Sequence, residues 1–341
     1  MKRLTLKDIA KALNLSVPTI SKALSDSHEI NKETKEKIVA YAHEHNYQYN
    51  ALARSLKTGK TNIIGVIVST ISNSFFSQIL EGIEESSLFQ QYNIIIMQSR
   101  ENPAIEKKCI DILYSKGVDG ILISPVSDRA NLNYLEQLHH SDCPIVIFDR
   151  INNSVNTFKI GIDNKKASKR ATQELIDRNY RNILHITGLA NGVTNERLTG
   201  FQEALKQNKI IFDETLLLRC DLSQIQIVEQ QILSKLKELE KEQHRPDAIF
   251  TATDLLTNRT IGLLAQQKIK IPEQIALIGF SNTNYAFSFN PPLTCVSQPA
   301  KNIGKLAFEK MIYILECRLK KREIVYETIE LDADITIRES I

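Results

Sequence analysis

The sequence predicts an α/β protein with an all-α head and a two-lobed body built on parallel sheets. The first 60 residues contain helical patterns and no strand-like run. From residue 62 onward, short continuous apolar runs alternate with helical segments, as expected for parallel sheets covered on both faces. The alternation comes in two series of similar length. This repetition indicates two lobes of like architecture.

The head is expected to contain three helices and a short fourth segment. These segments are predicted at 6–13, 17–24, 32–45 and 50–56. Thr5 and Asp8 have the spacing of a capping box, while Ser16 and Asn31 are suited to cap the second and third helices. The fourth segment is only two turns long, which is marginal for an isolated helix in water.

The body is expected to be a regular succession of strands and helices. In the first series, strands are predicted at 63–69, 93–98, 120–123 and 144–148, and helices at 74–90, 104–116 and 131–140. In the second series, strands are predicted at 183–187, 215–218, 248–251 and 275–279, and helices at 165–178, 195–207, 224–242 and 254–267. The tail is expected to complete both lobes with a helix at 300–321 and strand-like segments at 324–331 and 334–338.

Composition and charge limit the classes of protein to which the chain can belong. The chain has 341 residues, 42% hydrophobic and 24% charged, and no apolar run approaches the roughly 18 residues that span a bilayer. The charged N-terminus does not look like a signal peptide, so a cytoplasmic protein is expected. Residues 1–60 carry 11 basic and 6 acidic side chains, whereas the remainder carries 32 and 34. A basic head on a near-neutral body indicates a polyanionic partner for the head.

Motifs for metal, disulfide or catalytic chemistry are missing or incomplete. The cysteines are odd in number and lack a C-x-x-C pair, so they are expected to be buried apolar residues: Cys109, Cys143, Cys220, Cys295 and Cys317. Residues 59–61 match the end of a P-loop, but Arg54 stands where that motif needs its first glycine. His43-Glu44 begins a metalloprotease-like H-E-x-x-H motif, but Tyr47 stands where the motif needs its second histidine. We expect no metal, no cofactor and no enzyme. The alternative is a doubly wound sugar-modifying enzyme with a fused helical module.

The first two head helices, joined by a tight turn and followed by a third, are a helix-turn-helix candidate. In the second helix, Ile20, Ala23 and Leu24 form the inward face. The outward residues carry short polar groups and one cation, which suit base edges and phosphates: Val17, Pro18, Thr19, Ser21 and Lys22. The pattern and charge leave open a three-helix module that binds another protein.

Segments along nearly the whole chain match the motifs of one known family. They lie at 5–10, 15–24, 31–47 and 50–56 in the head, and at 61–66, 72–76, 197–201, 278–280, 291–294 and 298–299 in the body. In these segments the chain resembles the lactose-repressor (LacI/GalR) family of transcription regulators, and 50–56 resembles the family's hinge helix. The resemblance implies a ligand-responsive repressor whose body is like a periplasmic sugar-binding protein. A transport-type solute-binding protein is a third hypothesis, which the charged N-terminus disfavours.

The resemblance also implies the domain organisation and the partners. The expected parts are a helix-turn-helix DNA-binding domain at 1–49, a hinge helix and linker at 50–61, and a two-lobed effector-binding and dimerisation domain at 62–341. Lobe one is expected at about 62–160 and 292–321, and lobe two at about 161–291 and 322–341. The partners are a palindromic DNA operator, a small-molecule effector such as a sugar or sugar derivative, and a second copy of the chain, with no membrane. The C-terminus lacks the leucine-rich helix of the family's tetramers, so a homodimer is expected.

Site residues follow from the same resemblance. The residues expected to contact DNA are Thr5, Ser16, Val17, Pro18, Thr19, Ser21, Lys22, His28, Asn50, Ala53 and Leu56. Leu56 would enter the minor groove and kink the operator when two hinge helices fold there. The residues expected to contact the effector are Phe75, Phe76, Asp149, Arg197, Asp254 and Ser281. Several stand where strands end, and open α/β sheets bind ligands at such positions.

Two departures from the family pattern bear on specificity. Lys22 stands where the family commonly has arginine, and lysine lacks the forked geometry that reads guanine with two hydrogen bonds. Ser281 and Asn282 stand where the family often has an aspartate that binds sugar hydroxyls. Either the effector is not a plain hexose or hydroxyl recognition has moved. Asp254 has an alternative role as a helix N-cap, and the sequence leaves the effector, the operator and the sign of the response open.

Overall fold

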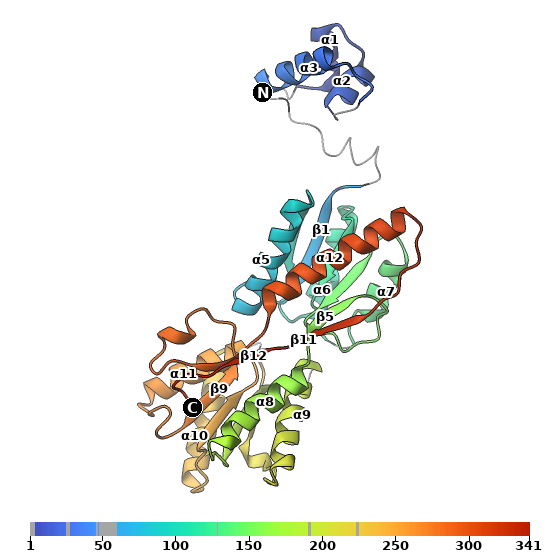
Figure 1. Ribbon diagram of the computed structural model, residues 1–341. Coiled ribbons are helices and arrows are strands. Elements are labelled where there is room, and N and C mark those ends of the chain that lie inside the picture. The colour runs from blue at the N-terminus through green and yellow to red at the C-terminus, as the bar shows by residue number, and fades with distance from the viewer. Residues whose placement is uncertain are drawn as a thin grey trace. The chain divides into compact units, whose positions relative to one another are not determined.

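A computed structural model describes residues 4–24, 28–45, 47, 60–127, 129–189, 192–222 and 225–341. The chain forms two compact units, residues 1–61 and 62–341 (Figure 1). Within the described part of the chain, no helix is long and apolar enough to cross a membrane.

The head consists of three helices around a small apolar core. They are α1 (Leu6–Leu13), α2 (Val17–Leu24) and α3 (Lys32–Glu44). Each helix contributes one fully buried isoleucine, namely Ile9, Ile20 and Ile38. The predicted capping box is confirmed, because Thr5 and Asp8 each accept a hydrogen bond from the other's backbone N–H. The predicted caps of α2 and α3 are also confirmed by backbone hydrogen bonds to their side chains.

Lobe one contains a six-stranded parallel sheet. Its strands are β1 (Ile63–Val68), β2 (Asn93–Gln98), β3 (Gly120–Ile123), β4 (Ile145–Phe148), β5 (Lys159–Ile162) and β11 (Thr328–Leu331), in the order β11-β5-β4-β3-β1-β2. Its helices are α5 (Ser74–Phe89), α6 (Pro103–Ser115), α7 (Leu132–His140) and α12 (Ala300–Leu319). Val146 packs in the core that α5 and α12 share, whereas Ile145 and Ile147 pack with α6 and α7. Alternate strand residues therefore bury both faces of the sheet.

Lobe two repeats this architecture. Its strands are β6 (Ile183–Gly188), β7 (Leu217–Cys220), β8 (Ala248–Thr251), β9 (Ala276–Phe280), β10 (Thr294–Ser297) and β12 (Asp334–Thr336), in the order β12-β10-β9-β8-β6-β7. Only β12 pairs antiparallel, along β10. Its helices are α8 (Asn164–Asp177), α9 (Gly192–Gln207), α10 (Ile225–Lys241) and α11 (Asp254–Gln266), with short 3₁₀ turns at Glu214–Leu216 and Ala286–Ser288. The core places α8 and α9 on one face, and α10 and α11 on the other.

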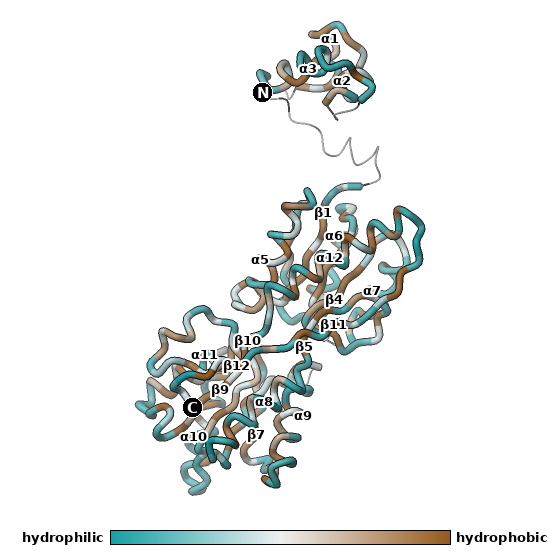
Figure 2. The backbone as a smooth tube through the Cα atoms, viewed as in Figure 1, coloured by the Kyte–Doolittle hydropathy of each residue, from teal (hydrophilic) through white to brown (hydrophobic). Residues whose placement is uncertain are grey.

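Apolar residues are concentrated in the strands of both sheets, as the brown segments of Figure 2 show. All five cysteines are buried and free, which confirms the prediction for them. The predicted α/β class, with a helical head and two lobes of parallel strands, is likewise confirmed.

Two assignments of segments to lobes are wrong. Residues 294–297 were expected in lobe one, but β10 pairs with β9 in lobe two. Residues 328–331 were expected in lobe two, but β11 pairs with β5 in lobe one. The chain thus passes between the lobes after β5, β10 and β11 (Figure 1). Strand patterns record burial along the chain, whereas sheet membership depends on pairing with distant segments.

Local differences are smaller. The strand at 159–162 was not predicted, because Lys159 and Gly161 interrupt its apolar pattern. The strand predicted at 215–218 lies two residues later, after a 3₁₀ turn that Asp213 caps.

Candidate functional site

The expected DNA-contacting residues of the described head lie on its surface or at its edge. Thr5, Ser16, Pro18 and His28 are exposed. Thr19, Ser21 and Lys22 are partly exposed on α2. None of these seven side chains belongs to the head core.

Val17 is only partly available for contact. It was expected to point outward, but it is half-buried and packs against the head core. The outward face of α2 is therefore narrower than the helical pattern indicated. Asn50, Ala53 and Leu56 lie outside the described residues, so their expected role at the hinge stays a prediction.

The cation on α2 already has an anionic neighbour. The ammonium group of Lys22 forms an ion pair with the carboxylate of Glu29, and both side chains remain substantially exposed. Any phosphate or base contact made by Lys22 therefore competes with Glu29.

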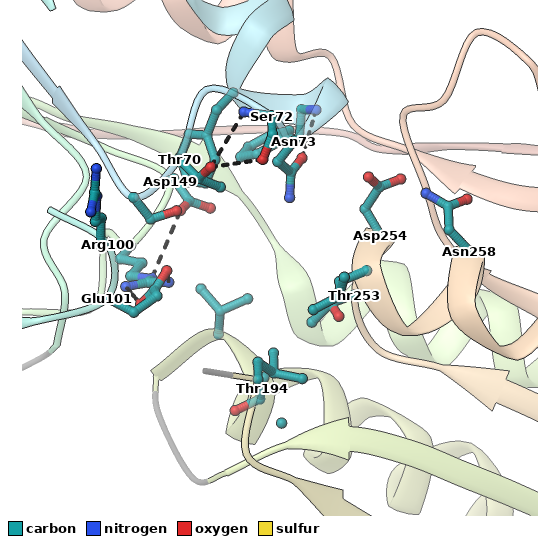
Figure 3. A pocket seen from close by; sticks show the side chains of 18 of the residues that line it. Thr70, Ser72, Asn73, Arg100, Glu101, Asp149, Thr194, Thr253, Asp254 and Asn258 are labelled. Carbon is teal, nitrogen blue, oxygen red and sulfur yellow. Dashed lines mark hydrogen bonds and ion pairs between the residues drawn. The ribbon is translucent and has the colours of Figure 1, made fainter. Parts of the chain in front are cut away.

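A cavity of about 850 Å³ lies between the two lobes of the body. Its walls are the carboxyl ends of strands and the first turns of the helices that follow them. In Figure 3, Ser72, Asn73 and Asp149 of lobe one face Thr194 and Asp254 of lobe two across the open space. Parallel strands of both sheets thus deliver their terminal side chains to one place.

Five of the six expected effector residues line this cavity: Phe75, Phe76, Asp149, Arg197 and Asp254. The phenylalanines come from the first turn of α5, which begins where the Asn73 side chain caps the helix. Their rings pack edge to face, with centroids 5.3 Å apart, and form an apolar wall. Val193 and Leu222 supply apolar surface from lobe two.

Asp149 follows β4 with a left-handed backbone, φ 66°. Non-glycine residues rarely adopt this conformation, and it often marks functional positions. Its Oδ2 accepts a hydrogen bond from Ser124 Oγ at 2.9 Å and lies 3.9 Å from Arg150 Nε. Burial raises the pKa of Asp149, while Arg150, Ser124 and Arg197 act to lower it.

Arg197 is a buried and fixed cation of the cavity. Its side chain donates to Asn164 Oδ1 at 2.8 Å, to the Ala252 carbonyl at 2.6 Å and to Gln298 Oε1 at 3.2 Å. Its guanidinium lies 3.6 Å over the Phe280 ring. Burial lowers the pKa of Arg197 to about 10, which still leaves it protonated at neutral pH. The guanidinium has five N–H groups, and two of them have no partner among the residues that the structure describes.

Asp254 lies on the opposite wall from Asp149. The alternative in which it caps α11 is wrong, because Thr253 is the N-cap and its hydroxyl accepts the Leu256 N–H at 3.3 Å. Asp254 Oδ1 accepts from Ser281 Oγ at 2.5 Å and from the Asn282 N–H at 3.3 Å. Burial raises the pKa of this carboxyl, against the two hydrogen bonds that lower it.

Ser281 is not among the residues that line the cavity, so its expected contact with the effector stays a prediction. It is buried behind Asp254 and orients that carboxylate. Sequence patterns could not separate the two roles, because both residues follow strands at the same edge of the sheet.

Several lining residues were not expected. Arg150 and Glu101 line the cavity and form a bidentate ion pair. Arg150 Nη2 donates to Glu101 Oε1 at 2.7 Å, and Arg150 Nη1 donates to Glu101 Oε2 at 2.9 Å. Asn258 and Gln298 also line it. Glu101 follows β2 by three residues and Gln298 directly follows β10, so position after a strand was the available signal for both. Asn258 lies one turn inside α11, where no strand end marks it.

A helical head with a helix-turn-helix and a two-lobed body with a central cavity together define a class, the ligand-binding transcription regulators. Residues 5–50 match the model of "Bacterial regulatory proteins, lacI family", and residues 61–332 match "Periplasmic binding proteins and sugar binding domain of LacI family". The chain belongs to the LacI family. The prediction of a transcription regulator that is not an enzyme is thereby confirmed.

Relatives and solved structures agree with this assignment. The chain is 31% identical to the HTH-type transcriptional repressor PurR of Vibrio parahaemolyticus over 342 residues, covering 99% of this chain and 98% of that protein. It is 30% identical to the ribose operon repressor of Haemophilus influenzae, with the same coverage. Its fold is similar to that of the Lac repressor dimer bound to operator and the anti-inducer ONPF, with a TM-score of 0.84, 20% identity and 99% of each chain covered.

Proposed function

We propose that the protein is a cytoplasmic, homodimeric repressor that binds a palindromic operator and changes its operator affinity when a small polar molecule occupies the inter-lobe cavity. The observation that carries this proposal is the cavity itself. It gathers one buried cation and two half-buried carboxylates from two lobes beside an apolar wall. Convergent polar groups on an apolar surface are typical of small-molecule sites.

The charges at the site favour a hydroxyl-rich ligand. Asp149 and Asp254 are acceptors, and Arg197 is a donor with two unused N–H groups. A hydroxyl both donates and accepts, so a sugar or a ribose-bearing compound satisfies all three. The cavity is lined by four arginines and four acidic residues, and this balance argues for a ligand without net charge: Arg100, Arg150, Arg197, Arg259, Glu101, Asp149, Asp221 and Asp254.

We infer that hydroxyl recognition has moved to Asp254. The pair Ser281-Asn282 brings no carboxylate to the position after the Gly-Phe motif. Asp254 supplies one to the same corner, because Ser281 and Asn282 both donate to its Oδ1. Its Oδ2 is the atom offered to the ligand.

On the DNA side, we propose that Thr5, Ser16, Pro18, Thr19, Ser21, Lys22 and His28 meet one half-site, with Val17 contributing its exposed edge. Two copies related by a two-fold axis would read a palindrome. The proposed hinge residues are Asn50, Ala53 and Leu56.

The test begins with finding an operator and an effector. Selection from a random duplex library should enrich a palindrome, and binding to it should weaken steeply with salt. A thermal-shift screen with pentoses, hexoses, disaccharides, nucleosides and nucleobases should find a stabilising compound. That compound should change the affinity for the selected duplex. If selection enriches no palindrome, the proposal is wrong.

Asp254→Asn is the matched variant for the cavity. The asparagine can keep the oxygen that accepts from Ser281 and Asn282, and it replaces Oδ2 by a donor. We expect at least a ten-fold loss of effector affinity by calorimetry, with effector-free operator binding unchanged. Effector binding equal to that of the wild-type protein would remove Asp254 from the site.

A further inference from the structure

Three amide residues form a cluster that joins the lobes beside the cavity, through the side chains of Gln78 and Asn282 and the backbone of Gln298. The amide cluster consists of Gln78 on α5 of lobe one, Asn282 after β9 of lobe two, and Gln298, where the chain crosses from β10 to α12. Gln78 Nε2 donates to the Asn282 carbonyl at 2.8 Å, and Asn282 Nδ2 donates to Gln78 Oε1 at 2.9 Å. Each of the two residues therefore donates one hydrogen bond to the other, and both hydrogen bonds join lobe one to lobe two.

Asn282 also fixes the crossing segment. Its Nδ2 donates to the Gln298 carbonyl at 2.7 Å, and its Oδ1 accepts the Gln298 N–H at 3.1 Å. Asn282 is only 7% exposed, so water cannot readily replace these partners. Separating the lobes at Gln78 would remove the partner of the Asn282 carbonyl and one partner of its Nδ2, while the two hydrogen bonds to Gln298 remain. Buried polar groups that lose a partner destabilise the arrangement that leaves them so.

The amide cluster reaches the cavity through Gln298. Gln298 Oε1 accepts a hydrogen bond from Arg197 Nη2 at 3.2 Å, the longest of the three hydrogen bonds of Arg197. Gln298 and Arg197 line the cavity, whereas Gln78 and Asn282 do not. A ligand that binds Arg197 thus contacts a residue that is hydrogen-bonded to Gln298, and Gln298 lies in the crossing segment that Asn282 fixes.

We propose that the amide cluster sets the equilibrium between lobe arrangements, and through it operator affinity, without contacting effector or DNA. This rests on the proposed function, because it assumes that operator affinity depends on lobe arrangement. Gln78 and Asn282 are positioning residues. Their hydrogen bonds exist only while α5 and the loop after β9 keep this spacing, so they favour one arrangement over any other. An effector at Arg197 biases the same equilibrium.

The test variant is Gln78→Met, which keeps the length and packing of the side chain. It removes both hydrogen bonds to Asn282 and a third that Gln78 Nε2 donates to Asn284 Oδ1 at 3.3 Å. The control is Ser77→Ala on the same helix, since the exposed Ser77 hydroxyl donates only to the Ser74 carbonyl at 3.0 Å. Hydrogen exchange is measured on the full-length protein without DNA. In Gln78→Met, peptides covering 281–285 and 298–302 should exchange at least five-fold faster, and in Ser77→Ala they should not change. Exchange at wild-type rates in Gln78→Met overturns the proposal.

The second measurement is affinity for the selected duplex with no small molecule added. Gln78→Met should change this affinity at least three-fold. The affinity should increase if the amide cluster favours the lobe arrangement that binds operator weakly, and decrease if the cluster favours the arrangement that binds operator strongly. Faster exchange with unchanged affinity overturns the proposal, because the amide cluster would then only pack the lobes together. Failure of the proposed function is distinguishable, since the wild-type protein itself would then bind no duplex specifically.

Discussion

The ionised side chains of the cavity are held by the protein before any ligand arrives. Asp254 is oriented by Ser281, and Arg197 is fixed by Asn164 and by the Phe280 ring. Fixed rotamers reduce the entropy that binding would otherwise cost. The price is that each charge is partly desolvated, as the raised pKa of Asp254 and the lowered pKa of Arg197 indicate.

The ion pair on α2 gives a prediction for DNA affinity. Glu29→Gln should strengthen operator binding up to about five-fold, because an exposed ion pair is worth about 0–1 kcal/mol and Lys22 would be released from it. Loss of a negative charge near the phosphates acts in the same direction. Fluorescence anisotropy at several salt concentrations measures the effect.

Lys22→Ala is the opposing control for Glu29→Gln. If Lys22 contacts a base, its loss should weaken binding by about 1–3 kcal/mol. Glu29→Gln in the Lys22→Ala background should then gain less than in the wild-type background. Equal gains in both backgrounds would show that Glu29 does not act through Lys22.

A buried histidine predicts acid sensitivity. His185 is fully buried and stacks on Phe201 with ring centroids 4.7 Å apart, and burial lowers its pKa to about 3. In the unfolded chain this histidine has a pKa of about 6.5. Between about pH 6.5 and 3 the unfolded chain therefore binds more protons at His185 than the folded chain does. Stability from His185 is therefore complete above about pH 7 and is lost as pH falls, by about 2 kcal/mol between pH 7 and 5.

His185→Phe isolates this contribution. The phenyl ring can stack on Phe201 but does not titrate. Urea unfolding at pH 7 and 5 should show a loss of stability in the variant about 2 kcal/mol smaller than in the wild-type protein. Carboxyls with raised pKa values, such as Asp149 and Asp254, change stability in the opposite sense but are common to both proteins. Identical losses in the two proteins would contradict the assignment.

Among the helices, α5 and α12 approach each other closely through glycines. A Cβ atom on Gly304 would overlap the Ile79 carbonyl, and one on Gly82 would overlap the Lys301 carbonyl. Both obstacles are backbone atoms, so neither can rotate away. This close approach also fixes the position of α5, which carries Phe75 and Phe76 into the cavity.

Two glycine-to-alanine variants separate packing from helix propensity. Gly304→Ala should destabilise the body by about 1–3 kcal/mol, because α12 must move away from α5. Gly262→Ala on α11 should stabilise it by about 0.5–1 kcal/mol, since nothing lies within 4 Å of its Cβ position. Chemical denaturation measures both free energies of unfolding. A neutral Gly304→Ala would mean that the helices can separate freely.

For the molecule as a whole, the proposed function requires the body and the head to communicate through the residues that join them, which include the proposed hinge. The three passages between the lobes couple their movement, so a ligand in the cavity can change the arrangement of both sheets. The proposed hinge at 50–56 would convert that arrangement into operator affinity by folding over the minor groove.

Leu56→Ala tests the hinge. Without the apolar wedge, specific binding should weaken and DNA bending should decrease, whereas weak non-specific binding should persist because the basic head remains. Gel mobility of circularly permuted operator fragments measures bending. Undiminished bending by the variant would exclude Leu56 as the wedge.

Local chemistry in the sequence by itself determined much of this protein. The cap residues Thr5 and Asn31 fix the starts of head helices, and continuous apolar runs identify most buried strands, because these signals involve neighbours in the chain. The family resemblance, supported by their positions after strands, nominated Asp149 and Asp254 for the cavity. The motifs from residue 5 to 299 indicated the family.

Only the tertiary structure decided what depends on distant pairing. The sequence could not assign β10 and β11 to their sheets, because a strand pattern does not specify its partner. It could not place Ser281 behind Asp254 or reveal the hydrogen bonds between Gln78 and Asn282, which are 204 residues apart. Such contacts arise when three chain passages bring two separately patterned lobes together, and no local signal records them.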